Sequence, residues 1–229
     1  MNAVLASQPA VTDTPGHADA HAVPGAGFAD PARGSHAVFR AVLTAWSHPG
    51  RSVALVSDAE VPSGVSREAA SVLLALLDAE TTLWLSPRLQ ATPVGAWLRF
   101  HTGCVLVATA MQAQFAWVAE GDALPALTEL GVGTDASPET AVTLLVETQG
   151  WAHASGGWQL TGPGLAQPLP LALNADGPER VQALRGLHQS AAALFPRGVD
   201  MLMTAPGRVL GLPRTTRIHV NAAPVAEEV

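Results

Sequence analysis

Apolar residues recur at two different spacings along the chain, and the alternation between these spacings predicts both helices and strands. In residues 35–47 the apolar positions lie three or four apart, which is the spacing of an amphipathic helix with one buried side. Residues 66–77 repeat this pattern behind Ser66, a favoured N-cap residue. Residues 178–195 repeat it over a longer segment with Pro178 near its start. Three principal helices are therefore expected.

Short apolar runs between these helices predict buried strands. The predicted strands cover residues 52–57, 81–86, 104–109, 113–118, 141–147, 157–162, 199–205 and 208–212, and two shorter helices are predicted at 93–100 and 125–131. Strands that interleave with helices, without an internal repeat or a linker, indicate one α/β domain with a mixed sheet covered by helices.

The two ends of the chain differ from this pattern. Residues 1–26 mix Ala, Pro, Gly and Asp without a period, which is typical of a disordered N-terminal tail. His17 and His21 have the spacing of two metal ligands on a helix, but the surrounding Pro and Gly favour an irregular tail. Residues 223–229 are expected to form a flexible C-terminal tail, so that a single domain spans residues 27–222.

The composition bounds the location and the surface of the protein. Only 14% of the 229 residues are charged and 48% are hydrophobic, which predicts an apolar surface partly covered by a partner. No apolar run is long enough to span a bilayer, and the N-terminus does not resemble a secretory signal. Cys104 is the single cysteine, so a disulfide within the chain is impossible and a cytoplasmic location is expected.

The charged residues exclude several functional classes. The net charge of −7 argues against general nucleic-acid binding, which requires clustered basic residues. The sequence contains no lysine, so this chain cannot form a Schiff base with pyridoxal phosphate or supply the lysine of a phosphate-binding P-loop. One cysteine cannot by itself hold an iron–sulfur cluster.

The segment "LRFHTGC" is the first candidate for site chemistry. Arg99 and His101 alternate with Leu98 and Phe100, so the polar pair is expected on one face and the apolar pair on the other. An arginine beside a histidine can bind phosphate or phosphonate oxygens, and the histidine can act as an acid or base. A surface pair with structural hydrogen bonds is an equally good interpretation. Cys104 is expected to be a buried small hydrophobe.

The segment "GLPRTTRIHV" is the second candidate. Pro213 interrupts a strand, and alternation beyond it predicts Arg214 and Thr216 on one face, with Thr215, Arg217 and His219 on the other. A guanidinium beside a hydroxyl at a sheet edge can hold an oxyanion or the carboxylate of a partner. Arg197 and Asp200 add a further charged pair where the long helix meets a strand, a common location for a site in α/β folds.

Four segments together resemble the PhnH family, whose members are subunits of the carbon–phosphorus lyase system for the use of phosphonates. These segments are "HAVFRAVLTAWSHPGR", "LRFHTG", "LTGPG" and "FPRGVDMLMTAPGRVLGLPRTTRI". The resemblance runs in the same order from about Gly27 to Val220. It implies a three-layer α/β/α sandwich with a mixed sheet, similar to the fold of pyridoxal-phosphate-dependent transferases but without that cofactor.

The resemblance also implies partners and an activity. It implies a homodimer and a core complex with PhnG, PhnI and PhnJ, which forms alpha-D-ribose 1-methylphosphonate 5-triphosphate from ATP and methylphosphonate. No cofactor, metal, nucleic acid or membrane is expected for this chain. With its single cysteine it cannot be the subunit that cleaves the carbon–phosphorus bond with an iron–sulfur cluster.

Two hypotheses follow for the role of this chain. In the first, it is a structural or assembly subunit without a ligand site, and its "PRTT" segment is structural or contacts a partner. In the second, a phosphate or phosphonate pocket is formed by Arg99, His101, Arg214 and Thr216. Convergence of these four side chains on one cleft would favour the second hypothesis. An independent hydrolase is a poor third, because no nucleophile elbow or metal-ligand set is present.

Overall fold

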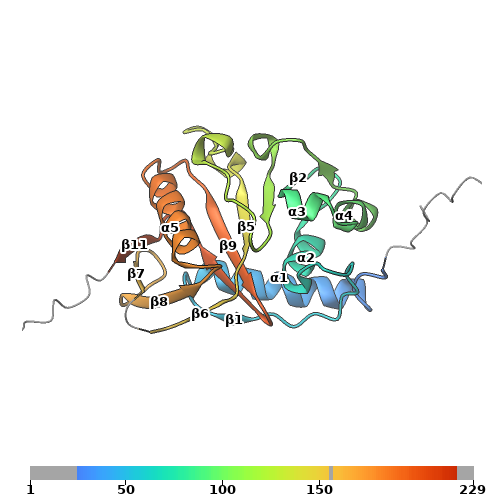
Figure 1. Ribbon diagram of the computed structural model, residues 1–229, viewed down its shortest axis with the longest axis horizontal. Helices are drawn as coiled ribbons and strands as arrows, with labels where there is room; N and C mark the ends of the chain where they lie inside the picture. Colours follow the sequence, from blue (N-terminus) through green and yellow to red (C-terminus); the bar gives the residue numbers. More distant parts are fainter. Residues whose placement is uncertain (1–24, 155–156, 221–229) are drawn as a thin grey trace, which may run out of the picture.

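The structure is a computed structural model that describes residues 25–154 and 157–220. The predicted tails lie outside the described residues, except for Gly25 and Ala26, as do His17 and His21. The first and last described residues are at opposite ends of the molecule (Figure 1). None of the described helices has the length and apolar character needed to cross a membrane.

A mixed sheet of seven strands forms the centre of the fold. Its order is β1-β10-β9-β5-β4-β2-β3. The strands are β1 (Val53–Ala54), β2 (Thr82–Leu85), β3 (Val105–Leu106), β4 (Phe115–Val118), β5 (Thr143–Glu147), β9 (Asp200–Ala205) and β10 (Arg208–Leu212). Strands β3, β2, β4, β5 and β9 are parallel, whereas β10 and β1 are antiparallel to their neighbours. The predicted mixed α/β architecture is confirmed.

The described helices differ in how they begin, since a side-chain cap precedes two of them. They are α1 (Pro31–Ser47), α2 (Arg67–Leu76), α3 (Pro87–Gln90), α4 (Val94–Thr102) and α5 (Pro178–Ala192). The N-cap of α2 is Ser66, as predicted, and its side chain accepts from the Ala69 amide. Helix α1 begins four residues before the predicted start, because the Asp30 carboxylate caps it by accepting two amide hydrogens. The predicted helix at 125–131 is only a 3₁₀ turn, Leu127–Glu129.

The central sheet separates two hydrophobic cores. One core packs α1, α2 and α4 on one face of the sheet, with Trp97, Trp117 and Leu73 among its fully buried side chains. The other core packs α5 and a second sheet on the opposite face, and includes Leu184 and Trp158. Both faces of the parallel strands are thus covered, which explains why these strands are continuous apolar runs without alternation (Figure 1).

A second, antiparallel sheet of four strands corrects the prediction of a single sheet. Its order is β11-β7-β8-β6, formed by β6 (Gly150–Ala152), β7 (Trp158–Thr161), β8 (Leu169–Asn174) and β11 (Arg217–Val220). Only β7 was predicted as an independent strand. Strand β6 has only three residues and begins at Gly150, while β8 contains Pro170, which is uncommon inside a strand, so neither was identified as a strand from the sequence.

Candidate functional site

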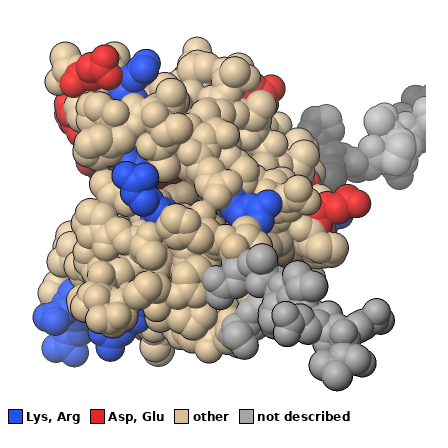
Figure 2. Space-filling model, turned by 90° about the vertical axis from the view of Figure 1, so that its left-hand side faces the viewer, with Lys and Arg blue, Asp and Glu red and all other residues tan. Residues whose placement is uncertain are grey.

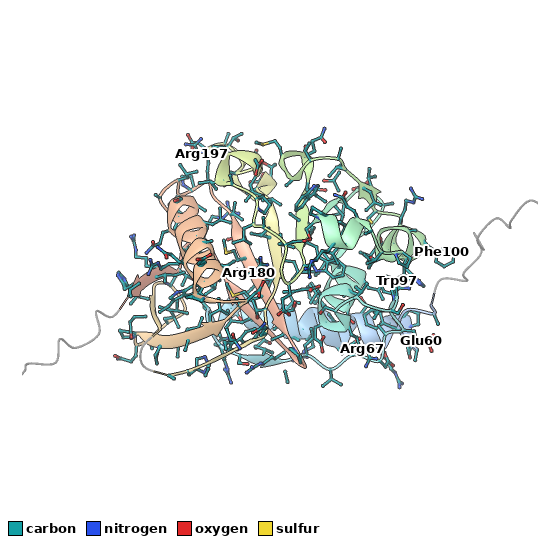
Figure 3. The ribbon with its side chains drawn as sticks, viewed as in Figure 1. Glu60, Arg67, Trp97, Phe100, Arg180 and Arg197 are labelled. Carbon is teal, nitrogen blue, oxygen red and sulfur yellow. The ribbon has the colours of Figure 1, made fainter. Side chains whose placement is uncertain are left out.

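The two predicted polar clusters lie in different parts of the molecule. Arg99 and His101 are on α4, in the same helix as Trp97 and Phe100, whereas Arg214 and Thr216 lie next to α5. Figure 3 shows Trp97 and Phe100 on the opposite side of the molecule from Arg197. The four predicted side chains therefore do not converge on one cleft.

His101 has a structural role on α4. Its Nε2 lies 2.8 Å from the Gly25 carbonyl oxygen, and the indole Nε1 of Trp97 donates to the same oxygen at 3.1 Å. The ring of His101 also meets that of Trp97 edge-on at 5.0 Å. Because a carbonyl can only accept, Nε2 carries the proton. The predicted alternation is wrong here: the segment is helical, so Leu98 is buried while Phe100 is 68% exposed.

The Arg99 side chain is exposed and makes no hydrogen bond or ion pair within the described residues, whereas the Arg99 carbonyl accepts from the Gly103 amide at 2.9 Å. Cys104 follows the helix and is buried, as predicted, and this burial raises the pKa of its thiol. A thiol held in its neutral form is a weak nucleophile. The α4 cluster thus offers one free guanidinium and no reactive group.

The "PRTT" segment is a turn rather than part of a strand, which corrects the predicted alternation. The Thr216 amide donates to the Pro213 carbonyl at 2.9 Å, and β11 begins only at the next residue. The turn carries the chain from β10 of the central sheet to β11 of the small sheet. Pro213 suits this place because it has no amide hydrogen to offer the ladder of the sheet.

Arg214 is held inside this corner of the fold. Its backbone amide and its Nε donate to the Asp200 carboxylate at 2.7 and 3.0 Å, and a terminal nitrogen bonds the same carboxylate. The other terminal nitrogen donates to the carbonyls of Pro138 and Pro196 at 2.9 and 3.2 Å. Since a guanidinium has five N–H groups, four of them are engaged here. Arg214 therefore ties three segments together and has little capacity left for an anion.

Arg197 stands at the rim of the same corner. Its Nε lies 3.1 Å from a carboxylate oxygen of Asp135, and both side chains are substantially exposed. The next residue, Gly198, donates its amide to the Val132 carbonyl at 2.9 Å. Arg197 and Asp200 thus join neighbouring loops through Asp135 and Arg214, and their membership of a site stays a prediction.

A cleft of about 510 Å³ lies between the end of α5, the turn and β11. Three of the predicted residues line it, namely Arg214, Thr215 and Thr216. Its other walls come from His188, Gln189, Ala192, Ala193, Phe195 and Ile218, and Arg217 and His219 lie at its edge. This volume falls within the range of small-molecule sites. Figure 2, which faces the end of the molecule with α5 and β11, shows separated basic patches on a largely uncharged surface.

His188 is the polar residue of this cleft that was not predicted. Its side chain is buried, with Nε2 3.2 Å from the Pro213 carbonyl, while Nδ1 has no partner among the described residues. Burial lowers the pKa of the imidazole, although the Pro213 carbonyl and the negative charge of Asp200 oppose this shift. The lowered pKa keeps the ring neutral at pH 7. Its place on the apolar stripe of α5 concealed this role in the sequence.

Thr216 provides a second unsatisfied group beside it. The residue is 1% exposed, and its Oγ1 has no partner among the described residues. A buried polar group without a partner costs about 1–3 kcal/mol. Four further buried side-chain atoms among the described residues, in Trp151, Arg180, Arg197 and Thr204, also lack a hydrogen-bond partner, so the two groups beneath the cleft do not by themselves mark a ligand site.

A second hollow, of about 390 Å³, lies at the carboxyl ends of β2, β4 and β5. Ligands of α/β folds commonly bind at such an edge. Here Glu120, Glu147 and Asp176 line it together with Arg88. The Glu147 carboxylate accepts from Trp117 Nε1 at 2.9 Å and from the Glu120 amide at 3.1 Å, and burial raises its pKa. The excess of carboxylates makes this hollow unsuited to an anion.

Metal chemistry finds no support in the described part of the chain. No group of three or more His, Cys, Asp or Glu side chains is placed there so that it could hold a metal ion. The cleft beside α5 thus combines a neutral polar floor, apolar walls and basic residues at its edge. It can bind a neutral or anionic small molecule by hydrogen bonds and charge.

Comparison with known proteins gives matches that agree with one another and cover most of the chain. The family model described as bacterial phosphonate metabolism protein (PhnH) matches residues 26–219. The alpha-D-ribose 1-methylphosphonate 5-triphosphate synthase subunit PhnH of Rhizobium meliloti (strain 1021) is 33% identical over 195 residues, which cover 84% of this chain and 94% of that protein. The putative C-P lyase subunit protein HtxG of Stutzerimonas stutzeri is 30% identical over 187 residues, 81% of this chain and 86% of that protein.

Proposed function

Because the chain belongs to the PhnH family of bacterial phosphonate metabolism proteins, we propose that it is a subunit of the carbon–phosphorus lyase core complex. In this role it supports the formation of alpha-D-ribose 1-methylphosphonate 5-triphosphate from ATP and methylphosphonate, the product in the name of the Rhizobium relative. The observation that carries the proposal is the match over 94% of that relative.

The placement of the predicted residues supports an accessory role. Arg99 and His101 are far from the cleft, and Arg214 is occupied by Asp200. The described residues offer a weak nucleophile at Cys104 and no metal-binding cluster. The chain thus acts with other subunits, and we expect the purified chain alone to release no adenine from ATP in the presence of methylphosphonate.

The partners we propose are a second copy of the chain and the other core subunits, PhnG, PhnI and PhnJ. Exposed apolar side chains support an interface: Phe39 and Leu43 on α1 are 47% and 56% exposed. They lie one helical turn apart, beside an apolar hollow of about 310 Å³ that includes Trp46 and Phe115. A single helix face of this kind can pack on its own copy around a two-fold axis.

The fold and location complete the proposal. We infer that the central sheet and its helices share the architecture of pyridoxal-phosphate-dependent transferases, while the absence of lysine from this sequence removes the Schiff base. The protein is expected to work in the cytoplasm with the rest of the complex. The alternative is a purely structural subunit without a ligand site. The internal hydrogen bonds of Arg214 support this alternative, because they give that residue a structural role.

Growth of a host that lacks its own PhnH tests the proposal. The chain should restore growth on methylphosphonate as the sole phosphorus source, and it should copurify with the other core subunits. Growth on inorganic phosphate is the control, since it does not require the complex. A chain that folds and accumulates but restores no growth would contradict the proposed function.

A further inference from the structure

We propose that the cleft between α5 and β11 is the docking site for an acidic segment of another core subunit. A carboxylate of that segment binds Arg217, and an aliphatic side chain beside it packs against Phe195 and the apolar wall of α5. The choice of a core subunit as the partner rests on the proposed function. The chemistry of the segment rests on the charge, exposure and contacts of the described residues.

The cleft is positively charged in a chain whose net charge is −7. Two arginines and two histidines line it, and none of the described residues that line it is an aspartate or a glutamate. By contrast, the hollow at the carboxyl ends of β2, β4 and β5 contains three carboxylates, and the apolar hollow beside α1 contains Asp200. A partner that approaches the cleft is therefore favoured by negative charge.

Arg217 carries the positive charge that is available to a partner. Arg214 is already paired with Asp200 in a largely buried contact. The side chain of Arg217 is exposed and forms no ion pair or hydrogen bond within residues 25–154 and 157–220. A guanidinium binds a carboxylate through two parallel hydrogen bonds, so a glutamate or aspartate of the partner matches this group.

The inner part of the cleft offers apolar contact rather than hydrogen bonds. The unpartnered atoms beneath it, His188 Nδ1 and Thr216 Oγ1, are buried and cannot be reached. The side chain of Gln189 is engaged, because its Nε2 donates to the Ile218 carbonyl at 2.8 Å. The wall on the side of α5 consists of small apolar side chains, Ala192 and Ala193. An aliphatic side chain fits this surface better than a polar one.

Phe195 favours a polypeptide over a small anion as the occupant. It lines the same cleft as Arg217, and its side chain is 65% exposed. A small anion bound to the guanidinium would leave this aromatic ring in water. A polypeptide segment can cover both groups, because one of its side chains packs on the ring while a neighbouring carboxylate reaches the arginine. Aromatic residues and arginine are also the residue types enriched in protein interfaces.

The segment docks through its side chains rather than as an added strand. Strand β11 is at the edge of the small sheet and pairs with β7 on one side. The Ile218 carbonyl in the middle of β11 is already bonded by Gln189 of α5. Adding a strand to a sheet edge requires free backbone groups, and this acceptor is occupied.

A second copy of this chain is a poorer match for the cleft. In a two-fold contact through it, each Arg217 would approach another basic cleft without carboxylates, so that like charges would meet. The dimer proposed through α1 uses a different surface, since α1 and α5 pack on opposite faces of the central sheet (Figure 1). The dimer and the docked subunit can therefore form together.

Affinity capture from cells that express the tagged full chain with PhnG, PhnI and PhnJ tests the docking site. Arg217→Glu reverses the available charge, and Phe195→Ser removes the exposed ring. Each variant should lower the recovery of the three core subunits per tagged chain by about tenfold or more. The matched controls are Arg67→Glu on α2 and Phe100→Ser on α4, which change exposed residues of the same types away from α5 and should capture as much as the wild type (Figure 3).

Thermal unfolding and light scattering separate a lost contact from a lost fold. Both replaced side chains are exposed, so the variants should melt close to the temperature of the wild type. Reduced capture by variants that melt and scatter like the wild type supports the docking site. A variant that loses the dimer of the wild type would show that a second copy occupies the cleft, which would overturn the proposal.

Growth on methylphosphonate distinguishes a wrong docking site from a wrong function. If the wild type restores growth and both variants capture the core subunits as well as it does, the docking site is wrong and the proposed function stands. Loss of growth in Arg217→Glu with undiminished capture would mean that the cleft takes a small anion, and would also overturn the proposal. A wild type that restores no growth and captures no core subunit would refute the proposed function and the docking site with it.

Discussion

Arg214 and Asp200 are joined by three hydrogen bonds, from the amide, Nε and a terminal nitrogen of the arginine to the carboxylate. Asp200 is the first residue of β9 and Arg214 lies in the turn after β10, so the pair ties the two ends of this hairpin together. The side chains are only 12% and 21% exposed. The arginine that first suggested an anion site is therefore a structural clamp.

Replacement of Arg214 by alanine should consequently destabilise the protein. Removing one partner of a largely buried ion pair costs about 3 kcal/mol, because the remaining carboxylate and the carbonyls of Pro138 and Pro196 lose their donors. Urea unfolding measures this cost as a lower midpoint. Arg217→Ala is the control and should change stability by less than about 0.5 kcal/mol, since that side chain is exposed. A loss below about 1 kcal/mol in Arg214→Ala would show that the clamp is unimportant.

This clamp also shows which features the sequence could predict. The helices and the buried strands have clear periods, and Ser66 and Pro178 were correctly placed at helix starts. The turn at Pro213 was correctly recognised as an interruption of a strand. The predicted orientation of the residues after Pro213 was wrong, because the alternation of a strand was assumed to continue through a turn. In that turn Arg214 points inward to the Asp200 carboxylate, fourteen residues away.

The small sheet and the floor of the cleft depend on contacts that no local pattern contains. Strand β11 pairs with β7, a segment almost sixty residues earlier, so its place could not be derived from its own alternation. His188 lies on the apolar stripe of α5, where a histidine is usually a core residue with a satisfied ring. Only the structure shows that its Nδ1 has no partner among the described residues and that it lines a cleft with Thr216.

The buried ring of His188 should give the stability of the protein a specific pH dependence. Its pKa in the folded protein lies below the ordinary value of 6.5, so the unfolded chain binds more protons as the pH falls. The contribution of the neutral ring is thus complete above the unfolded pKa and is lost as the pH falls through the folded one. The groups that face the ring are the carboxylate of Asp200 and the carbonyls of Pro213 and Leu212.

Urea unfolding of wild type and His188→Gln between about pH 7.5 and 5 isolates this effect. The free energy of unfolding of the wild type should decrease more steeply toward low pH than that of the variant, which has no ring to protonate. All other histidines are common to both proteins and cancel in the difference. Parallel pH profiles would mean that the ring has the same pKa in the folded and the unfolded protein.

The contact between Gly27 and His101 gives a further prediction. Gly27 has φ +71°, and a Cβ at this position would lie 3.2 Å from the His101 ring. Gly27→Ala should therefore cost about 1–3 kcal/mol through backbone strain and through displacement of the ring from the Gly25 carbonyl. Gly64→Ala is the matched control, because φ is +77° there but nothing lies within 4 Å of the new Cβ. Equal melting temperatures for the two variants would show that the ring contact contributes nothing.

The last prediction concerns association through α1. Phe39 and Leu43 expose large apolar side chains one helical turn apart, and burying them is favourable by about 25 cal/mol per Å² of apolar surface. A specific interface requires roughly 1,000 Å² in total, which a pair of α1 helices and their flanking residues can supply around a two-fold axis. Light scattering at micromolar concentration should give twice the chain mass of 23.5 kDa.

Leu43→Glu tests whether this face is the interface, because the two-fold axis would bring two carboxylates into an apolar contact. The variant should sediment and scatter as a monomer with an unchanged melting transition, since Leu43 is already 56% exposed. Phe100→Glu on α4 is the control for adding a charge to an exposed apolar position and should leave the dimer intact. A wild-type monomer would refute the dimer itself, whereas a dimeric Leu43→Glu would place the interface elsewhere.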